Sequence, residues 1–404
     1  MKKVKINIVL LALMLLMVSS AAVIAQGPPP PPPANPEITL QFPLDSGMDG
    51  QSYILNFKVY ENGVLINPSA FYADEVAVKF RLTGVVAKGD FWIERAGENI
   101  RLTWDQVKYP NPIIYVLTGD GTGQYVDNNV GDNWKLVTDA SIKDEFDSAT
   151  SLSDGELIHK NQVGNVSTHP EVYYKIFNGA AGDFGAAPAV GKFDAVVSGA
   201  GDKSYKYSFV SIPFGVTDTS ANYVFGSQVA SGDAQASATE LWEWTGTTFG
   251  NQQYLNKTAG WENIGGFGSV QAIPGIAYVF KTKQRSADIK ITMVGTIMKS
   301  FTPIPIAANL YSFIANPYPI NIGIASVNLA DANGVYAGAG SGMADQLWGW
   351  TGDTFGDQAY YKTGTGWEAI GGFSNITSLQ PGMGFVYRRN SSAAAGGFNW
   401  GFTP

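Results

Sequence analysis

Cysteine is missing from all 404 residues of the sequence, and this absence excludes disulfide bridges, thiol nucleophiles and zinc–thiolate sites. Charged residues are also scarce, at 15% of the chain. The acidic residues number 34 and the basic residues 26, which gives a net charge of −8. A nucleic-acid partner requires a basic face that neutralises phosphates. We therefore expect no nucleic-acid binding.

Histidine and the common catalytic motifs are also scarce or missing. His159 and His169 are the two histidines, and the sequence has no G-x-S-x-G nucleophile elbow, no P-loop and no G-x-G-x-x-G fingerprint. A catalytic triad needs a base that is oriented by a carboxylate and lies within reach of a nucleophile. Neither histidine lies in such a pattern. We expect both in surface loops and predict that the protein is not an enzyme.

The residues that are abundant indicate an all-β protein. Apolar residues make up 45% of the chain, aromatic residues 13%, and glycine contributes 47 positions. This composition is too apolar for a disordered chain and too rich in glycine for a helical bundle. The length corresponds to two or three domains. We predict a multidomain fold of antiparallel sandwiches or small barrels.

The N-terminus has the three parts of a secretory signal peptide. Three lysines within residues 1–5 precede the apolar run Ile6–Val18, and Ala25 offers a small residue for cleavage. A membrane anchor is the alternative, but the apolar run is short for a span. We predict a signal peptide over 1–25 and a stiff polyproline spacer over 26–36. The protein is then secreted, extracellular or on the cell surface, with no transmembrane segment after signal removal.

An internal repeat fills the C-terminal half of the chain. Residues 241–267 and 347–373 align without a gap, and 17 of the 27 positions are identical. The repeating unit of about 100 residues has the size of a domain rather than of a solenoid repeat. We therefore expect two β-modules, copy 1 over 200–300 and copy 2 over 301–404, each with its own core. The alternation of side chains within each copy has the period of a strand.

The order of motifs in each copy resembles a known type of module. An aromatic strand (YSFVSIPF or YSFIANPYP) is followed by a W-x-W strand (LWEW or LWGW), a GWE turn and a Pro-Gly turn into a second aromatic strand (IPGIAYVF or QPGMGFVYR). This order resembles the paired C-terminal modules of many secreted bacterial surface proteins of uncharacterised role. These proteins often carry a lead-in like Val190-Gly191-Lys192-Phe193. The resemblance covers 190–404 and implies no catalytic residue.

The region before the repeat is similar to a fibronectin type III domain. Its candidate strands at 99–104, 113–117 and 170–177 are similar to the B, C and F strands of that family. The resemblance implies a β-sandwich over 98–199. Residues 37–97 form a β-rich region that either completes this sandwich or makes a small domain before it.

Two sets of acidic residues are candidate sites. Asp120, Asp127 and Asp132 lie in or after a glycine-rich stretch, and clustered carboxylates suit calcium, although the EF-hand spacing is missing. A solvated Asx turn is the simpler interpretation, and no other cofactor is expected. Glu262 and Glu368 occupy equivalent places in the two copies, so a glycoside hydrolase would need a composite site that joins them.

Aromatic side chains are the strongest candidates for ligand binding. Trp and Tyr rings stack on sugar faces or on apolar partners, and two tryptophans at positions i and i+2 share one face of a strand. That face is either the core of the module, which we favour for a small module without cysteine, or an exposed platform. The candidate residues are Trp242, Trp244, Tyr254, Trp348, Trp350 and Tyr360.

These observations favour an exported, non-enzymatic structural protein of the cell surface or extracellular matrix, whose β-modules mediate protein or cell-surface interaction. The first alternative is a carbohydrate- or polymer-binding protein that uses the repeated Trp and Tyr platforms, where two modules add avidity. The second alternative is a hydrolase with a composite carboxylate site. The expected partner is a protein or a polysaccharide on the cell surface or in the matrix, and self-assembly is left open.

Overall fold

The computed structural model describes four short segments within the first 89 residues, namely 38–42, 53–57, 60–61 and 64–65. From residue 90 on, it describes all residues except 124, 126–133, 149–151, 200, 202, 284–286, 309 and 392–396. Contacts divide the chain into two units, Met1–Thr83 and Gly84–Pro404. The expected signal peptide and polyproline spacer lie outside the described residues.

The first unit contains two antiparallel strand pairs, β1–β2 and β3–β4. The bounds of these strands are Ile38–Phe42, Tyr53–Phe57, Tyr60–Glu61 and Val64–Leu65. The second unit begins with a hairpin of β5 (Phe91–Ala96) and β6 (Asn99–Trp104). This hairpin crosses the expected boundary between 37–97 and 98–199, so the residues on the two sides of that boundary belong to one sheet.

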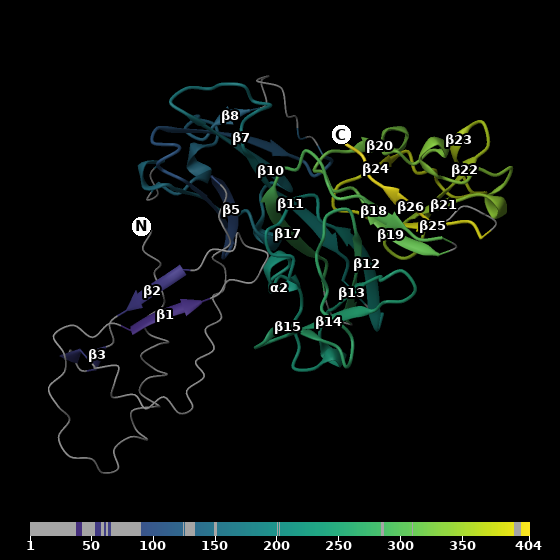
Figure 1. Ribbon diagram of the computed structural model, residues 1–404, viewed down its shortest axis with the longest axis horizontal. Coiled ribbons are helices and arrows are strands. Elements are labelled where there is room, and N and C mark those ends of the chain that lie inside the picture. Colours follow the sequence, from purple (N-terminus) through teal and green to yellow (C-terminus); the bar gives the residue numbers. More distant parts are fainter. Residues whose placement is uncertain are drawn as a thin grey trace, which may run out of the picture. The chain divides into compact units, whose positions relative to one another are not determined.

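A β-sandwich opens the second unit (Figure 1). One of its sheets has the strand order β5-β6-β9 and the other the order β17-β11-β10-β7-β8. The strands not yet described are β7 (Pro112–Gly119), β8 (Lys135–Leu136), β9 (Glu156–His159), β10 (Glu171–Asn178), β11 (Ala189–Val197) and β17 (Ile289–Thr296). β6 lies in one sheet, and β7 pairs with β10 in the other, which is the arrangement that B, C and F strands have in such sandwiches. The fibronectin type III assignment itself stays a prediction.

The central strand of the larger sheet, β10, is buried on both faces of the sheet. Seven consecutive residues of β10, from Glu171 to Phe177, are buried, so this strand lacks the alternation of a half-exposed strand. Val172 and Tyr174 belong to the cluster between the two sandwich sheets. Tyr173 and Phe177 point to the opposite face and belong to a cluster shared with copy 1 of the repeat.

The two repeat copies form five-stranded sheets of the same strand order (Figure 1). The order is β12-β16-β13-β14-β15 in copy 1 and β19-β25-β21-β22-β23 in copy 2. The strands of copy 1 are β12 (Tyr205–Ser211), β13 (Glu240–Glu243), β14 (Asn251–Asn256), β15 (Gly260–Asn263) and β16 (Ala277–Lys283). Those of copy 2 are β19 (Tyr311–Ala315), β21 (Gln346–Gly349), β22 (Asp357–Lys362), β23 (Gly366–Ala369) and β25 (Gly384–Arg388).

Each copy also has a leading strand and a trailing strand that pair with each other. In copy 1 these are β11 and β17, which pair over eight residues. In copy 2 they are β18 (Ile304–Ile306) and β26 (Phe398–Trp400). The expected start of copy 1 at residue 200 is therefore too late, because its leading strand begins at Ala189. β11 also pairs with β10, so copy 1 is continuous with the sandwich.

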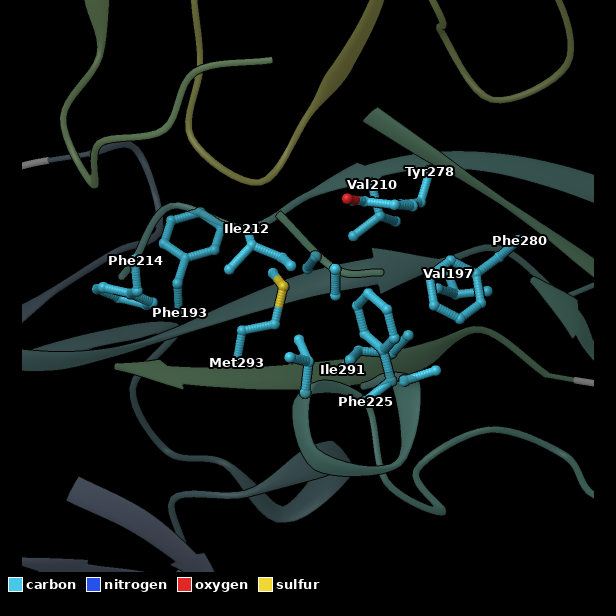
Figure 2. Packing of buried hydrophobic residues seen from close by; sticks show 14 of the residues in the cluster. Phe193, Val197, Val210, Ile212, Phe214, Phe225, Tyr278, Phe280, Ile291 and Met293 are labelled. Carbon is cyan, nitrogen blue, oxygen red and sulfur yellow. The ribbon is translucent and has the colours of Figure 1, made fainter. Parts of the chain in front are cut away.

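Figure 2 shows the cluster that joins copy 1 to the sandwich. Side chains of β11, β12, β16 and β17, with Phe225 at the end of the short helix α2 (Ala221–Val224), converge in it. Phe193 of β11 and Met293 of β17 are paired in the register and both belong to this cluster. Copy 2 has a separate cluster, which includes Leu347. Ile276 of copy 1 packs against both clusters, so neither copy has the fully independent core that was expected.

The prediction of an all-β fold is confirmed, and the sheets of the described residues are open rather than closed into barrels. α2 is the single α-helix in this part of the chain. A 3₁₀ turn at Ile324–Ser326 lies in copy 2. No helix among the described residues is long and apolar enough to cross a membrane. Two shorter strands, β20 (Ile322–Gly323) and β24 (Ser378–Leu379), pair beside the sheet of copy 2.

Candidate functional site

The strand register of each copy separates an inner face, which packs into the core, from an outer face. In copy 1, Trp242 lies opposite Gln252, and Tyr254 lies opposite Glu262. Opposite residues share a face, as do residues two apart on one strand. These four residues therefore share the outer face, whereas Leu241 points into the core. We call them the outer-face patch of copy 1. The equivalent patch of copy 2 consists of Trp348, Gln358, Tyr360 and Glu368.

Trp242 is half-buried on the outer face. Its indole N–H donates a 3.0 Å hydrogen bond to Oε2 of Glu240. The centroid of its ring system lies 5.7 Å from that of Tyr207 and 5.3 Å from that of Phe249. Nζ of Lys281 lies 4.9 Å from the Trp242 centroid, within the range of a cation–π interaction. The neighbouring side chains fix the position of the indole, and part of the indole stays exposed.

Trp348 has similar surroundings in copy 2. It is half-buried, and its indole N–H donates a 2.9 Å hydrogen bond to Oε1 of Gln346. Its centroid lies 5.7 Å from the centroids of Tyr311 and Phe355. The core interpretation of the first tryptophan in each W-x-W strand is therefore wrong. The period of two placed the two tryptophans of a strand on one face, and that face is the outer one.

The tyrosine and the glutamate of each patch are hydrogen-bonded to each other. The Tyr254 hydroxyl donates a 2.6 Å bond to Oε2 of Glu262, and the Tyr360 hydroxyl donates a 3.4 Å bond to Oε2 of Glu368. Nζ of Lys362 lies 2.9 Å from the same oxygen of Glu368, and this hydrogen bond raises the pKa of Lys362. Both carboxylates are half-exposed and have further lone pairs that accept hydrogen bonds from a ligand.

A buried carboxylate lies beneath the patch of copy 1. The Glu240 side chain is 1% exposed, its Oε1 atom lies 3.6 Å from Nζ of Lys281, and Lys283 also pairs with it. Burial lowers the pKa of Lys281, and the neighbouring Glu240 opposes that effect. In copy 2, Gln346 lies opposite Arg388 in the equivalent positions. Both copies therefore keep a basic residue at this place on the outer face.

The outer faces of the two copies differ less than their inner faces. All four positions of the patch are identical in the two copies, and the outer faces of these strands differ at two other pairs, Glu240 and Gln346, and Asn256 and Lys362. The inner faces of the same strands differ at five pairs, Glu243 and Gly349, Asn251 and Asp357, Gln253 and Ala359, Leu255 and Tyr361, and Asn263 and Ala369. Packing preserves buried positions, whereas exposed aromatic and charged residues are preserved by binding. The packing of the module cores therefore does not explain why the two patches are identical.

Two exposed phenylalanines beside the patches were not among the predicted site residues. Phe267 is 41% exposed and Phe373 is 43% exposed. Each ends an identical I-G-G-F turn, in which its main-chain N–H bonds the oxygen of the isoleucine. In copy 1 the next residue, Gly268, bonds the main chain of Gln252 in the patch. The identity of this turn in both copies was the available signal.

Trp244 and Trp350, which were also predicted as ligand-binding residues, do not belong to the patches. Each is half-buried. The indole N–H of Trp244 bonds the main-chain oxygen of Tyr311, and that of Trp350 bonds the main-chain oxygen of Tyr207. Both tryptophans therefore lie between the two copies of the repeat. Of the six predicted residues, four lie in the patches and two lie in this interface.

The two histidines lie close together around one carboxylate. His159 on β9 is fully buried, so the expected surface loop is wrong for it. Its Nε2 lies 2.9 Å from Oε2 of Glu145, and Nε2 of His169 lies at the same distance from the same oxygen. Nδ1 of His159 lies 2.6 Å from the hydroxyl of Tyr174. Burial lowers the pKa of His159, and its hydrogen bond lowers the pKa of Glu145.

Asp120 is the one candidate calcium ligand within the described residues, and it lies in a local turn. Oδ1 of Asp120 accepts hydrogen bonds from the main-chain N–H of Thr122 at 3.1 Å and from its hydroxyl at 2.5 Å, which is an Asx turn. Asp127 and Asp132 lie outside the described residues. Among the residues that are described, no three His, Cys, Asp or Glu side chains are grouped so that they hold a metal ion.

Comparison with protein-family models, with curated proteins and with solved structures found no match to this chain.

Proposed function

We propose that the protein is an exported, non-enzymatic binding protein of the cell surface or matrix, and that each of its two modules binds a carbohydrate polymer on its outer-face patch. The observation that carries this proposal is the identity of the patches in two copies whose inner faces differ. Selection for folding alone preserves the inner face first. Selection for a common ligand preserves the outer face instead.

The chemistry of a patch suits a sugar ring. The exposed part of the Trp242 indole is a flat apolar surface on which the C–H face of a pyranose stacks. The Glu262 carboxylate, which lies opposite Tyr254 on the same face, accepts hydrogen bonds from sugar hydroxyls, and the Tyr254 hydroxyl both donates and accepts.

Binding to soluble polysaccharides with glucan, xylan and chitin-derived backbones tests this proposal, measured by calorimetry on the full chain. The double variant Trp242→Ala/Trp348→Ala is expected to bind at least about tenfold more weakly, the equivalent of about 1.4 kcal/mol of lost stacking. Tyr336→Ala is the control, because this tyrosine is 37% exposed in copy 2 and belongs to neither patch. Full affinity of the double variant, or no binding to any of these backbones, would contradict the proposal.

A protein partner is a separate outcome of the same test. If the wild-type chain captures a protein from the surface fraction, and the double variant Trp242→Ala/Trp348→Ala does not, the patches bind a protein and the carbohydrate proposal is wrong. Capture of the same protein by the wild type and by the double variant would show that the patches take no part in that interaction.

Export is part of the proposal, and the charged, apolar and small-residue segments within residues 1–25 support it. Mass spectrometry of the exported protein is expected to find a chain that begins near Gln26. An exported chain that still contains residues 1–25 would show that cleavage does not occur there.

A further inference from the structure

The two copies pack against each other through reciprocal contacts. The Trp244 indole donates a 2.8 Å hydrogen bond to the main-chain oxygen of Tyr311, and the Trp350 indole donates a 3.1 Å bond to that of Tyr207. Trp350 is the repeat equivalent of Trp244, and Tyr311 is the equivalent of Tyr207. Two equivalent residues thus make the same contact in opposite directions. This reciprocity defines an isologous interface with a local twofold axis.

The main chain has the same symmetry. The Ser211 N–H donates a 3.1 Å hydrogen bond to the oxygen of Gly382, and the Ala315 N–H donates a 2.8 Å bond to the oxygen of Gly275. Ser211 is equivalent to Ala315, and Gly275 is equivalent to Gly382. Because backbone bonds join the copies from both sides, the interface holds them in a fixed relation.

The patches lie away from the twofold axis. The rings of the equivalent residues Phe209 and Phe313 are 5.5 Å apart, and two equivalent side chains that touch must lie at the axis. Trp242 lies two strands away from Phe209, across Val279, and Trp348 lies two strands away from Phe313, across Val386. Ring contacts with centroid distances between 5.1 and 5.7 Å connect the two phenylalanines to these tryptophans. In order, the series is Trp242, Phe249, Trp244, Phe313, Phe209, Trp350, Phe355 and Trp348.

We propose that the two patches bind two different polymer strands, so that one protein molecule bridges strands; this inference rests on the proposed carbohydrate binding. A polysaccharide strand has a direction from one end to the other. A twofold rotation returns a straight, directional strand to itself only if the strand runs along the axis. Phe209 and Phe313 lie at the axis, and the patches lie at the two ends of the ring series. A single straight strand therefore cannot make the same contacts, in the same direction, with both patches.

Bivalent bridging makes the protein a cross-linker of the polymer, and two measurements on the full chain test it. Calorimetry with a hexasaccharide of the bound backbone is expected to find two equal sites per chain. Light scattering of the protein with the corresponding long polysaccharide is expected to rise to a maximum and fall again at excess protein, because excess protein places a separate molecule on each site. Scattering of the protein alone is the control for self-assembly.

Single-patch variants separate binding from bridging. Trp348→Ala is expected to retain one hexasaccharide site, with the affinity of the wild-type sites, and to lose the scattering maximum. Trp242→Ala, in the other copy, is expected to behave in the same way, so a folding defect in one variant does not decide the result. Circular dichroism of both variants checks that the fold is unchanged.

The outcomes distinguish the two proposals. If the wild-type chain binds no hexasaccharide and no polysaccharide, the proposed function fails. Two hexasaccharide sites without polymer cross-linking, together with an affinity that rises at least about tenfold with strand length, would show that one strand occupies both patches and would overturn the inference. A single hexasaccharide site per wild-type chain, or cross-linking that persists in the single-patch variants, would overturn it as well.

Discussion

Trp244 and Trp350 each lie against a phenylalanine ring of the opposite copy. The Trp244 ring is stacked on Phe313, with an interplanar angle of 11° and 5.4 Å between centroids. The Trp350 ring lies 5.2 Å from Phe209. The second tryptophan of each W-x-W strand therefore neither fills the core of its own module nor forms a free platform. It joins the two modules, and this role explains its identity in both copies without any ligand.

We expect Trp244→Ala to loosen the contact between the copies. The variant loses the stacked ring and the hydrogen bond to Tyr311, which together contribute about 2 kcal/mol. Amide hydrogen exchange of Ser211 and Ala315, whose N–H groups bond across the interface, is expected to become about 30-fold faster. Trp242→Ala, two residues earlier on the same face, is the matched control and should leave this exchange nearly unchanged. Equal protection in both variants would show that the ring does not hold the interface.

The alternation of residues in the repeat predicted where strands lie. It did not predict that the first and the last strand of each copy pair with each other. Ile289, Ile291 and Met293 alternate with the period of a strand, and the structure places them in β17. Its partner β11 begins at Ala189, ahead of the region where the two copies match in sequence. The equivalent strand of copy 2 is the three-residue β18. Because the long and the short leading strand share no residue pattern, the sequence comparison could not show that they are equivalent.

The sequence predicted the tryptophan and the tyrosine of each patch as candidates, but not which face of the sheet carries them. A period of two shows which side chains share a face, but not which face meets the core, because both faces of these strands carry large residues. Leu241 and Trp242 are neighbours of similar apolar character, and the first is fully buried while the second is half-exposed. The buried ion pair of Lys192 and Asp194 was not predicted for a related reason. Nζ of Lys192 lies 3.0 Å from Oδ2 of Asp194, and both side chains are buried. The two residues alternate along β11 in the way that charged residues do on the exposed face of a half-exposed strand.

Trp261→Ala is expected to destabilise the protein by about 3–5 kcal/mol, as large core truncations do. Trp261 is 4% exposed on the inner face, and its indole N–H bonds the main-chain oxygen of Gly226 at 2.9 Å. The equivalent Trp367 is half-buried, so Trp367→Ala is expected to cost less. Urea unfolding of the full chain compares the two. A change below about 0.5 kcal/mol for Trp261→Ala, the usual surface range, would contradict the inner-face assignment.

Copy 2 contains a buried charged network that copy 1 lacks. The Asp345 carboxylate lies 2.7 Å from Nη1 of Arg389 and accepts a 2.6 Å hydrogen bond from the Tyr387 hydroxyl. Asp345→Ala removes the carboxylate that pairs with the guanidinium, which is 1% exposed. We expect this variant to lose about 3–5 kcal/mol in urea unfolding.

The residues of copy 1 supply the control for this network. Thr239, Phe280 and Thr282 occupy the equivalent positions and are fully buried. The triple variant Asp345→Thr/Tyr387→Phe/Arg389→Thr places the same three residues in copy 2 and removes both charges of the pair. It is expected to be more stable than Asp345→Ala. A triple variant that is no more stable than the single one would show that the buried guanidinium is not the cause of the loss.

The histidine cluster predicts a loss of stability in acid. Burial lowers the pKa of His159 below its usual value of 6.5. As the pH falls below 6.5, the unfolded chain therefore takes up a proton at this position before the folded chain does. A state that binds more protons is favoured as the pH falls, so the folded state loses stability. Glu145 acts in the same direction at lower pH, because its pKa lies below the usual 4.5 in the folded state.

His159→Gln is expected to remove the first part of this pH dependence. The variant should be less stable than the wild type at pH 7.5, because it alters the contacts with Glu145 and Tyr174. Its unfolding midpoint in urea should then fall less between pH 6.5 and 5 than that of the wild type, since no buried imidazole remains to be protonated. His169→Gln is the matched control: it removes the histidine that is 27% exposed and contacts the same carboxylate, while the buried one stays. This control is expected to keep the steep fall of the wild type. If the midpoints of the wild type and His159→Gln fall in parallel over this range, the acid sensitivity has another source.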